Sequence, residues 1–363
     1  MTDTKIYRDI AERTGGNVYI GVVGPVRSGK STFIKKFMDS VVIPCISSDF
    51  DKERARDELP QSAGGKTVMT TEPKFIPDEG VGIKTSDGTE LKVKLIDCVG
   101  YMIPEALGGE ENGEERMVHT PWHKDPVPFE TAAEYGTRKV ISEHSTIGML
   151  VTSDGTIGDF PRDNYAGAEE RVAAELTELN KPFAVILNSA KPESEESVAL
   201  AMKLEKKYGA PVALVNCMEL DAEDIWNILA MLLEEFPAKE ADIVLPGWTS
   251  VLPPEHKLKK AIRESVTEAA SCMVKLKDIR GAFSEKLTDG MKKAVGMCGS
   301  YPDEVKITST GTDAGEGNAV VDVNLPEGLY FDVISEITGI PMKNQTELLG
   351  AIDALSAAKH ELD

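Results

Sequence analysis

The sequence is poor in cysteine and contains no long apolar run. Five cysteines occur among 363 residues, and no two of them are spaced as in a C-x-x-C site. This odd number argues against a disulfide framework and favours reduced, mostly buried thiols. No apolar run approaches the roughly 18 residues that a membrane-spanning helix needs. Residues 1–12 are too polar for a signal peptide, so none is expected.

Basic residues are outnumbered by acidic ones. The chain has 40 Lys and Arg against 61 Asp and Glu, for a formal net charge of −21. An acidic surface of this kind repels nucleic acid and anionic lipid. The densest basic run, residues 257–263, lies on an expected helix and is interpreted as a solvated face. We therefore expect no nucleic-acid partner and no unaided membrane docking.

Against these absences stands one strong motif. Residues 24–31 read G-x-x-x-x-G-K-S, between an apolar run at 18–23 and a helix-like segment at 32–38. This pattern is typical of the phosphate-binding loop of P-loop NTPases. A glycine turn with a surface lysine is the alternative, which the flanking strand and helix disfavour. The expected nucleotide contacts in the loop are Gly24, Pro25, Val26, Arg27, Ser28, Gly29, Lys30, Ser31 and Thr32.

Each part of the loop has a chemical reason. The glycines let backbone N–H groups approach phosphate oxygens, and the following helix adds its positive dipole end. Lys30 is expected to reach the outer phosphates and Ser31 to coordinate Mg²⁺. Arg27 is either a stabiliser of γ-phosphate charge or a solvated side chain, and the sequence does not separate these alternatives.

A second Mg²⁺ contact is expected at the end of a neighbouring strand. Asp97 ends an apolar run, and Gly100 completes the pattern D-x-x-G, in which the glycine N–H meets the γ-phosphate. Between this motif and the P-loop lie Thr70 and Thr71, candidates for a threonine that senses the γ-phosphate and Mg²⁺. The sequence does not say which of the two acts. They could also simply open the next strand.

The identity of the nucleotide base is predicted from a difference between this sequence and the guanine-binding motif of GTPases. GTPases of this layout carry N-K-x-D after the fifth strand, and here residues 188–191 read N-S-A-K. Asn188 remains, but a lysine replaces the aspartate that pairs with guanine, so ATP is expected rather than GTP. Tyr101 stands where many GTPases have a water-positioning glutamine, which predicts slow turnover.

The remaining pattern predicts an α/β fold. Apolar strands at 17–23, 91–98, 147–152, 183–188 and 211–216 alternate with helical segments, as in a mostly parallel sheet with helices on both faces. We expect a P-loop NTPase domain over 1–237, a smaller α+β domain over 238–343 and a C-terminal helix over 344–363. The expected helices are 30–39, 129–144, 166–179, 195–207, 221–236 capped by Asp221, and one long helix over 255–286.

Other segments lead to narrower expectations. Residues 75–77 and 81–85 are predicted as two short strands, and 304–309 and 319–323 as a hairpin. The stretch after Pro237 is interpreted as a linker. The insertion 101–128 follows the D-x-x-G motif, and a loop of that length is often functional.

Several motifs together resemble the stage IV sporulation protein A family. They are the segments at 10–16, 24–38, 57–62, 70–75, 143–148 and 152–159. The likeness runs through the whole expected P-loop domain and continues more weakly through the middle domain. It implies a fold similar to that of translation-factor GTPases, in a protein that uses ATP and Mg²⁺ in place of GTP. By this resemblance Lys30 is the P-loop lysine, Asp97 coordinates Mg²⁺, and Thr70 and Thr71 are sensors, with Thr71 near the ion.

The resemblance also implies a role in the cell. Members hydrolyse ATP and assemble into a homopolymer, the basement layer of the spore coat of endospore-forming bacteria. Expected partners are other copies, a short amphipathic membrane-anchoring peptide and further spore coat proteins. The expected location is the mother-cell cytoplasm, at the outer forespore membrane surface. Family chains continue past Asp363 into a further domain, so this chain is expected to be shortened and to polymerise poorly.

Three functions are thus compared. The first is an ATPase that couples hydrolysis to self-assembly. The second is a GTPase-type switch or ribosome-assembly factor, which would prefer GTP and present a basic surface. The third is a structural protein with an inactive P-loop, against which the intact Lys30, Ser31 and Asp97 speak. The first agrees best with the sequence.

Overall fold

The computed structural model describes residues 3–60, 73–84, 90–106, 109–111, 114–298 and 301–362. The chain divides into two compact units, Met1–Glu235 and Phe236–Asp363. Within the described residues, no helix is both long and apolar enough to cross a bilayer.

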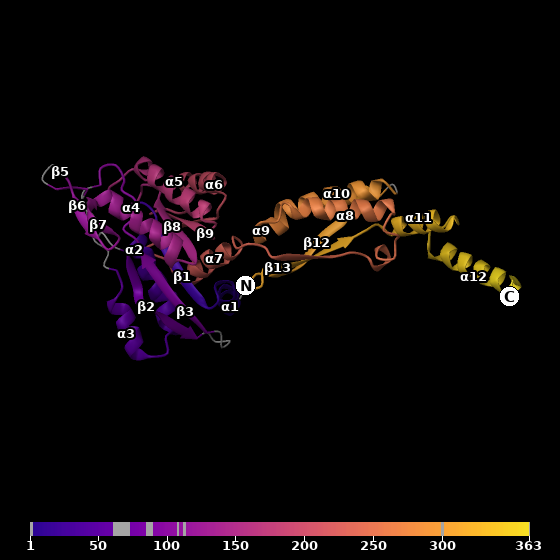
Figure 1. Cartoon of the computed structure of the whole chain (residues 1–363), viewed down its shortest axis with the longest axis horizontal. Coiled ribbons are helices and arrows are strands. Elements are labelled where there is room, and N and C mark those ends of the chain that lie inside the picture. Colours follow the sequence, from indigo (N-terminus) through magenta and orange to yellow (C-terminus); the bar gives the residue numbers. More distant parts are fainter. Residues whose placement is uncertain are drawn as a thin grey trace. The chain divides into compact units, whose positions relative to one another are not determined.

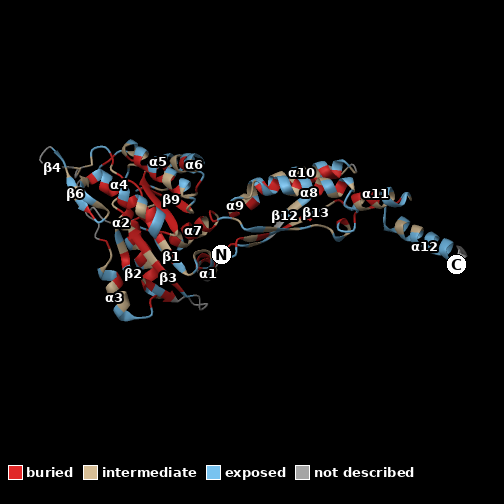
Figure 2. Ribbon diagram, viewed as in Figure 1, coloured by how far each residue is buried: buried red, intermediate tan, exposed pale blue. Residues whose placement is uncertain are grey.

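The first unit is built on a six-stranded sheet in the order β10-β9-β8-β1-β3-β2 (Figure 1). All neighbouring strands are parallel except β2 and β3. Every residue of β8 and β9 is buried, as expected for parallel strands covered on both faces (Figure 2). The strands are β1 (Asn17–Val23), β2 (Lys74–Lys84), β3 (Glu90–Asp97), β8 (Ile147–Ser153), β9 (Phe183–Asn188) and β10 (Val212–Val215).

The helices of this unit connect and cover those strands. They are α1 (Asp3–Thr14), α2 (Lys30–Phe37), α3 (Asp49–Asp57), α4 (Phe129–Lys139), α5 (Arg162–Glu178), α6 (Glu195–Tyr208) and α7 (Ala222–Leu233). The predicted cap of α7 is confirmed, because Asp221 and Asp224 form a reciprocal capping box. The mixed α/β fold with a largely parallel central sheet is as predicted.

Three local expectations in this unit were wrong. Helix α2 ends at Phe37 and passes into a π-helical turn at Met38–Val42 and a short 3₁₀ turn at Ile43–Cys45, where Pro44 has no N–H to continue an α-helix. The two strands expected at 75–85 are one strand, β2, with a bulge between Ile76 and Val81. The insertion contains two small hairpins, β4 (Glu110–Glu111) with β5 (Glu114–Glu115), and β6 (Met117–Thr120) with β7 (His123–Pro128).

The second unit has a three-stranded sheet beside helices. Its strands are β11 (Glu240–Val244), β13 (Asn318–Asn324) and β12 (Lys306–Asp313), in that order. The predicted hairpin is β12 and β13. The stretch interpreted as a linker contributes β11, which pairs in parallel with β13. Helices α11 (Glu327–Thr338) and α12 (Gln345–Leu362) follow the sheet.

The single long helix expected at 255–286 was also wrong. The chain forms α8 (Lys257–Ala270), α9 (Leu276–Asp278), a π-helical turn at 279–283 and α10 (Ser284–Gly296). Asp278 accepts hydrogen bonds from the N–H groups of Val274 and Lys275, which starts a new helix there. Gly281 then departs from helical geometry, with φ −98° and ψ −111°.

Candidate functional site

The predicted phosphate loop lies where β1 meets α2, at the carboxyl edge of the parallel sheet. Its two glycines are in positions where no other residue fits. Gly24 has φ +135°, and a Cβ there would lie 2.2 Å from the carbonyl oxygen of Val151. Gly29 has φ +103°, and its Cβ would lie 2.3 Å from the Asn188 amide nitrogen. The loop therefore depends on glycine for both its backbone turn and its close packing.

The other loop residues pack tightly around this turn. Pro25, Val26 and Ser28 are buried, whereas Arg27 is half-buried with φ +62°. Thr32 is half-buried on the first turn of α2. The Val26 N–H donates to the Tyr101 carbonyl at 2.9 Å, which ties the loop to the segment after β3.

Lys30 is held inside this loop. Its ammonium group donates hydrogen bonds to the carbonyl oxygens of Pro25 at 2.7 Å and Gly24 at 3.3 Å. The side chain is 6% exposed. Burial lowers the pKa of Lys30 to about 8, although Asp97 and Cys98 act in the opposite direction. A phosphate group beside this ammonium would supply negative charge in place of the hydration that burial removes.

Ser31 and Asp97 meet across the two central strands. The Ser31 hydroxyl donates to Oδ2 of Asp97 at 2.7 Å. Val22 of β1 pairs with Asp97 of β3, so sheet register brings this carboxylate to the loop. Burial raises the pKa of Asp97, opposed by Ser31, Lys30 and Lys74. A hydroxyl and a carboxylate side by side are the hard oxygen donors that Mg²⁺ prefers, so the donor set fits the predicted ion.

The D-x-x-G segment closes over the loop. Gly100 has φ +91°, and a Cβ there would lie 2.3 Å from the Gly24 carbonyl oxygen and 2.5 Å from Lys30 Nζ. The next residue, Tyr101, donates its N–H to the same Gly24 carbonyl at 3.2 Å. Gly100 is thus adjacent to the lysine, as a γ-phosphate contact would have to be.

The Tyr101 side chain is turned into the core. It is 1% exposed, and its hydroxyl donates to Oε1 of Glu175 on α5 at 2.6 Å. The Arg171 guanidinium lies 4.9 Å from the centre of its ring. Burial and the bond to Glu175 raise the pKa of Tyr101 above its usual value, so the hydroxyl stays protonated. This hydroxyl is therefore engaged away from the phosphate loop.

Asn188 links the end of β9 to the phosphate loop. Its side-chain nitrogen donates to the Ser28 carbonyl at 3.1 Å, and its side-chain oxygen accepts from the Cys217 N–H at 3.0 Å. Lys191, at the position of the missing aspartate, is exposed. Asn188 therefore joins three loops at one edge of the sheet.

Sequence reasoning missed a polar cluster beside this loop. Asp154 follows β8 and accepts hydrogen bonds from Thr156 and from Ser197, at the start of α6. Burial alone would raise the pKa of Asp154, but hydrogen bonds from Ser189, Thr156 and Ser197 hold it below its ordinary value. The available signal was that β8 and β9 end at the same sheet edge as the P-loop.

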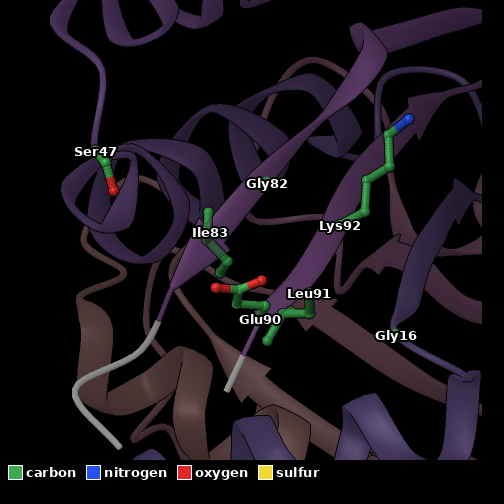
Figure 3. Close-up of a pocket in the computed structure, with 7 residues that line it drawn as sticks. All are labelled: Gly16, Ser47, Gly82, Ile83, Glu90, Leu91 and Lys92. Atoms are coloured by element: carbon green, nitrogen blue, oxygen red, sulfur yellow. The ribbon is translucent and has the colours of Figure 1, made fainter. Parts of the chain in front are cut away.

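Two further features do not belong to this group of residues. Thr70 and Thr71 lie outside the described residues, so their predicted role stays a prediction. A cavity of about 480 Å³ is lined by Gly16, Ser47, Gly82, Ile83, Glu90, Leu91 and Lys92 (Figure 3). Gly16 precedes β1 and Glu90 begins β3, so this cavity lies at the opposite sheet edge from the phosphate loop.

Known proteins match the whole chain. Residues 1–237 match the model of the stage IV sporulation protein A ATPase domain, and residues 238–363 match the middle domain of the same family. Stage IV sporulation protein A of Bacillus subtilis (strain 168) is 43% identical over 363 residues, covering 100% of this chain and 71% of the relative. The Bacillus anthracis protein is 44% identical with the same coverage. The Clostridioides difficile (strain 630) protein is 44% identical over 361 residues, covering 99% and 71%.

These matches agree with the geometry of the loop, in which the lysine, the serine and the aspartate are brought together. An ATPase domain implies that the chain binds a nucleotide. The chain belongs to the stage IV sporulation protein A family and is an ATPase.

Proposed function

We propose that the site binds ATP with Mg²⁺ and hydrolyses it slowly, in the manner of translation-factor GTPases. Lys30 binds the outer phosphate oxygens, and the Gly100 N–H meets the γ-phosphate. Ser31 and Asp97, together with Thr71, would hold Mg²⁺, and the bound ion would neutralise phosphate charge. The observation that carries this proposal is the 2.7 Å contact between Ser31 and Asp97 beside the buried Lys30.

Other residues of the chain have separate roles in the proposed reaction. The α2 N-terminus and the loop N–H groups orient the phosphates. Thr70 and Thr71 are the proposed sensors of the γ-phosphate. Tyr101 takes no part in orienting the attacking water, because its hydroxyl is bonded to Glu175. Slow turnover follows from the lack of a glutamine at this position.

ATP rather than GTP is the proposed nucleotide. Lys191 is exposed at the position where guanine-specific enzymes carry a carboxylate. A site without that acceptor loses its discrimination for guanine.

We also propose that ATP hydrolysis is coupled to self-assembly of the chain into a polymer that forms the basement layer of the spore coat. Membership of the family supports this proposal. Other copies of the chain, a short amphipathic membrane-anchoring peptide and further coat proteins are the proposed partners. The proposed location is the mother-cell cytoplasm, at the outer forespore membrane surface.

A competition titration tests the nucleotide assignment. A fluorescent ATP analogue is displaced by unlabelled ATP or GTP, each with Mg²⁺. Displacement at lower ATP than GTP concentrations is expected, and equal or tighter GTP binding would refute the assignment. The variant Thr70→Ala with Thr71→Ala should keep ATP binding and lose turnover. Normal hydrolysis by this variant would show that the threonines are not the sensors.

A further inference from the structure

The loop at 188–191 is held by hydrogen bonds that come from the end of the neighbouring strand. The Ala190 N–H donates to the Thr156 hydroxyl oxygen at 2.8 Å, and that hydroxyl donates in turn to Oδ1 of Asp154 at 2.6 Å. The Thr156 N–H reaches the same carboxylate oxygen at 2.9 Å. Thr156 therefore connects the loop backbone to a carboxylate.

The second carboxylate oxygen is anchored on the other side. Oδ2 of Asp154 accepts from the Ser197 hydroxyl at 2.8 Å, and Ser197 is 3% exposed in the first turn of α6. Ser189, which is fully buried, accepts the Lys191 N–H at 2.9 Å. Two consecutive N–H groups of the loop, those of Ala190 and Lys191, are thus bonded within the protein.

This arrangement has a consequence for base recognition. A guanine edge presents N–H donors and needs a carboxylate acceptor, whereas an adenine edge presents one amino group and a ring nitrogen. Oδ1 of Asp154 accepts two hydrogen bonds from Thr156 and Oδ2 accepts one from Ser197, so this carboxylate is mainly engaged in bonds within the protein. Its charge holds the loop in place.

We propose that Asp154 is a positioning residue for base selection, acting through Thr156 and Ser197 on the loop at 188–191. The network fixes the loop backbone, and the loop in turn receives adenine in preference to guanine. Asn188 extends the same rigid unit to the P-loop through Ser28. The inference rests on the proposed binding of adenine nucleotide at this site.

The test compares two substitutions of one side chain. Thr156→Val keeps the shape and removes the hydroxyl, whereas Thr156→Ser keeps the hydroxyl. Loss of one such hydrogen bond corresponds to a change of about fivefold in affinity. Thr156→Val should raise the KM for ATP by about that factor with little change in kcat. It should also lower the preference for ATP, measured as the Kd for GTP divided by the Kd for ATP. Thr156→Ser should restore both.

Two more variants complete the design. Ser197→Ala removes the hydroxyl that donates to Oδ2 of Asp154. It should also lower the ratio of the Kd for GTP to the Kd for ATP. Asp159→Asn changes an exposed acid on the same segment and should leave the ratio unchanged. If Thr156→Val and Ser197→Ala lower the melting temperature but keep the parental ratio, the network is structural only and the inference is overturned. If the parent itself prefers GTP, the proposed function fails, while a ratio shifted by the variants would still support the network's role.

Discussion

The hydroxyl of Ser31 lies 2.7 Å from Oδ2 of Asp97 and donates to it. Ser31 lies in the first turn of α2, and Asp97 ends β3, 66 positions further along the chain. In the proposed function, this contact places a hydroxyl and a carboxylate where they would hold the divalent ion of a bound nucleotide. The Asp97 carboxylate is half-buried, and partial burial disfavours its charge unless a cation is near.

This pair predicts the Mg²⁺ dependence of the enzyme. Asp97→Asn keeps the shape and removes the charge that draws the ion, so the Mg²⁺ concentration for half-maximal hydrolysis should rise by at least about tenfold. Titration of Mg²⁺ at fixed ATP measures it. Asp49→Asn, which changes a fully exposed acid on α3, serves as the matched control. An unaltered Mg²⁺ requirement in the Asp97 variant would remove this residue from the site.

Gly100 should tolerate no side chain. In Gly100→Ala the new Cβ would meet the Gly24 carbonyl and the Lys30 ammonium, at a φ of +91°. We expect a loss of more than about 2 kcal/mol in the free energy of unfolding, together with weaker nucleotide binding. Gly158→Ala is the control, since its φ is +79° but nothing lies within 4 Å of the added Cβ. The free energy of unfolding of that variant should fall by only about 1 kcal/mol. Urea unfolding of both proteins distinguishes close contact from backbone conformation alone.

Tyr101 should matter for stability and not for the chemical step. Tyr101→Phe removes the 2.6 Å hydrogen bond to Glu175 from a side chain that is 1% exposed. The free energy of unfolding should fall by about 1–3 kcal/mol, because a carboxylate loses its partner. The kcat at a temperature where both proteins are folded should stay within about twofold of the parent. A kcat reduced by about a hundredfold or more would assign this hydroxyl to catalysis.

Asp154 predicts a pH dependence. Its folded-state pKa lies below its ordinary value of about 4, so the stability that it contributes is present above that pH. This contribution is lost as the pH falls through the folded-state pKa. Asp154→Asn should therefore unfold more easily than the parent at pH 7, and the difference should shrink below about pH 4. Unfolding curves of both proteins at several pH values measure it. A difference that is the same at pH 7 and pH 3 would contradict the assigned charge.

The structural features predicted best from the sequence are those that depend on a local pattern of residues. The apolar runs of β1, β8 and β9 and the cap at Asp221 depend on residues close together in the chain, and each was found. The meeting of Ser31 with Asp97 followed from a motif whose spacing implies adjacent strands.

Features that depend on distant partners were missed. β11 is a strand because β13, almost 80 residues away, offers a free edge to pair with. Between α8 and α10, Asp278 accepts a hydrogen bond from the Lys275 N–H and Gly281 leaves helical geometry, and helical periodicity reveals neither. The cluster around Asp154 depends on a serine 43 positions later. Such contacts are created by the sheet order and are not visible in spacing.

The most direct test of the account is phosphate release by the purified chain with Mg-ATP and with Mg-GTP, measured side by side. Lys30→Ala removes the buried ammonium and serves as the inactive control, and Lys35→Ala removes an exposed ammonium from the same helix. The account predicts ATP turnover that Lys30→Ala abolishes, that Lys35→Ala retains and that exceeds GTP turnover. Faster release from GTP, or ATP turnover that survives Lys30→Ala, would contradict it.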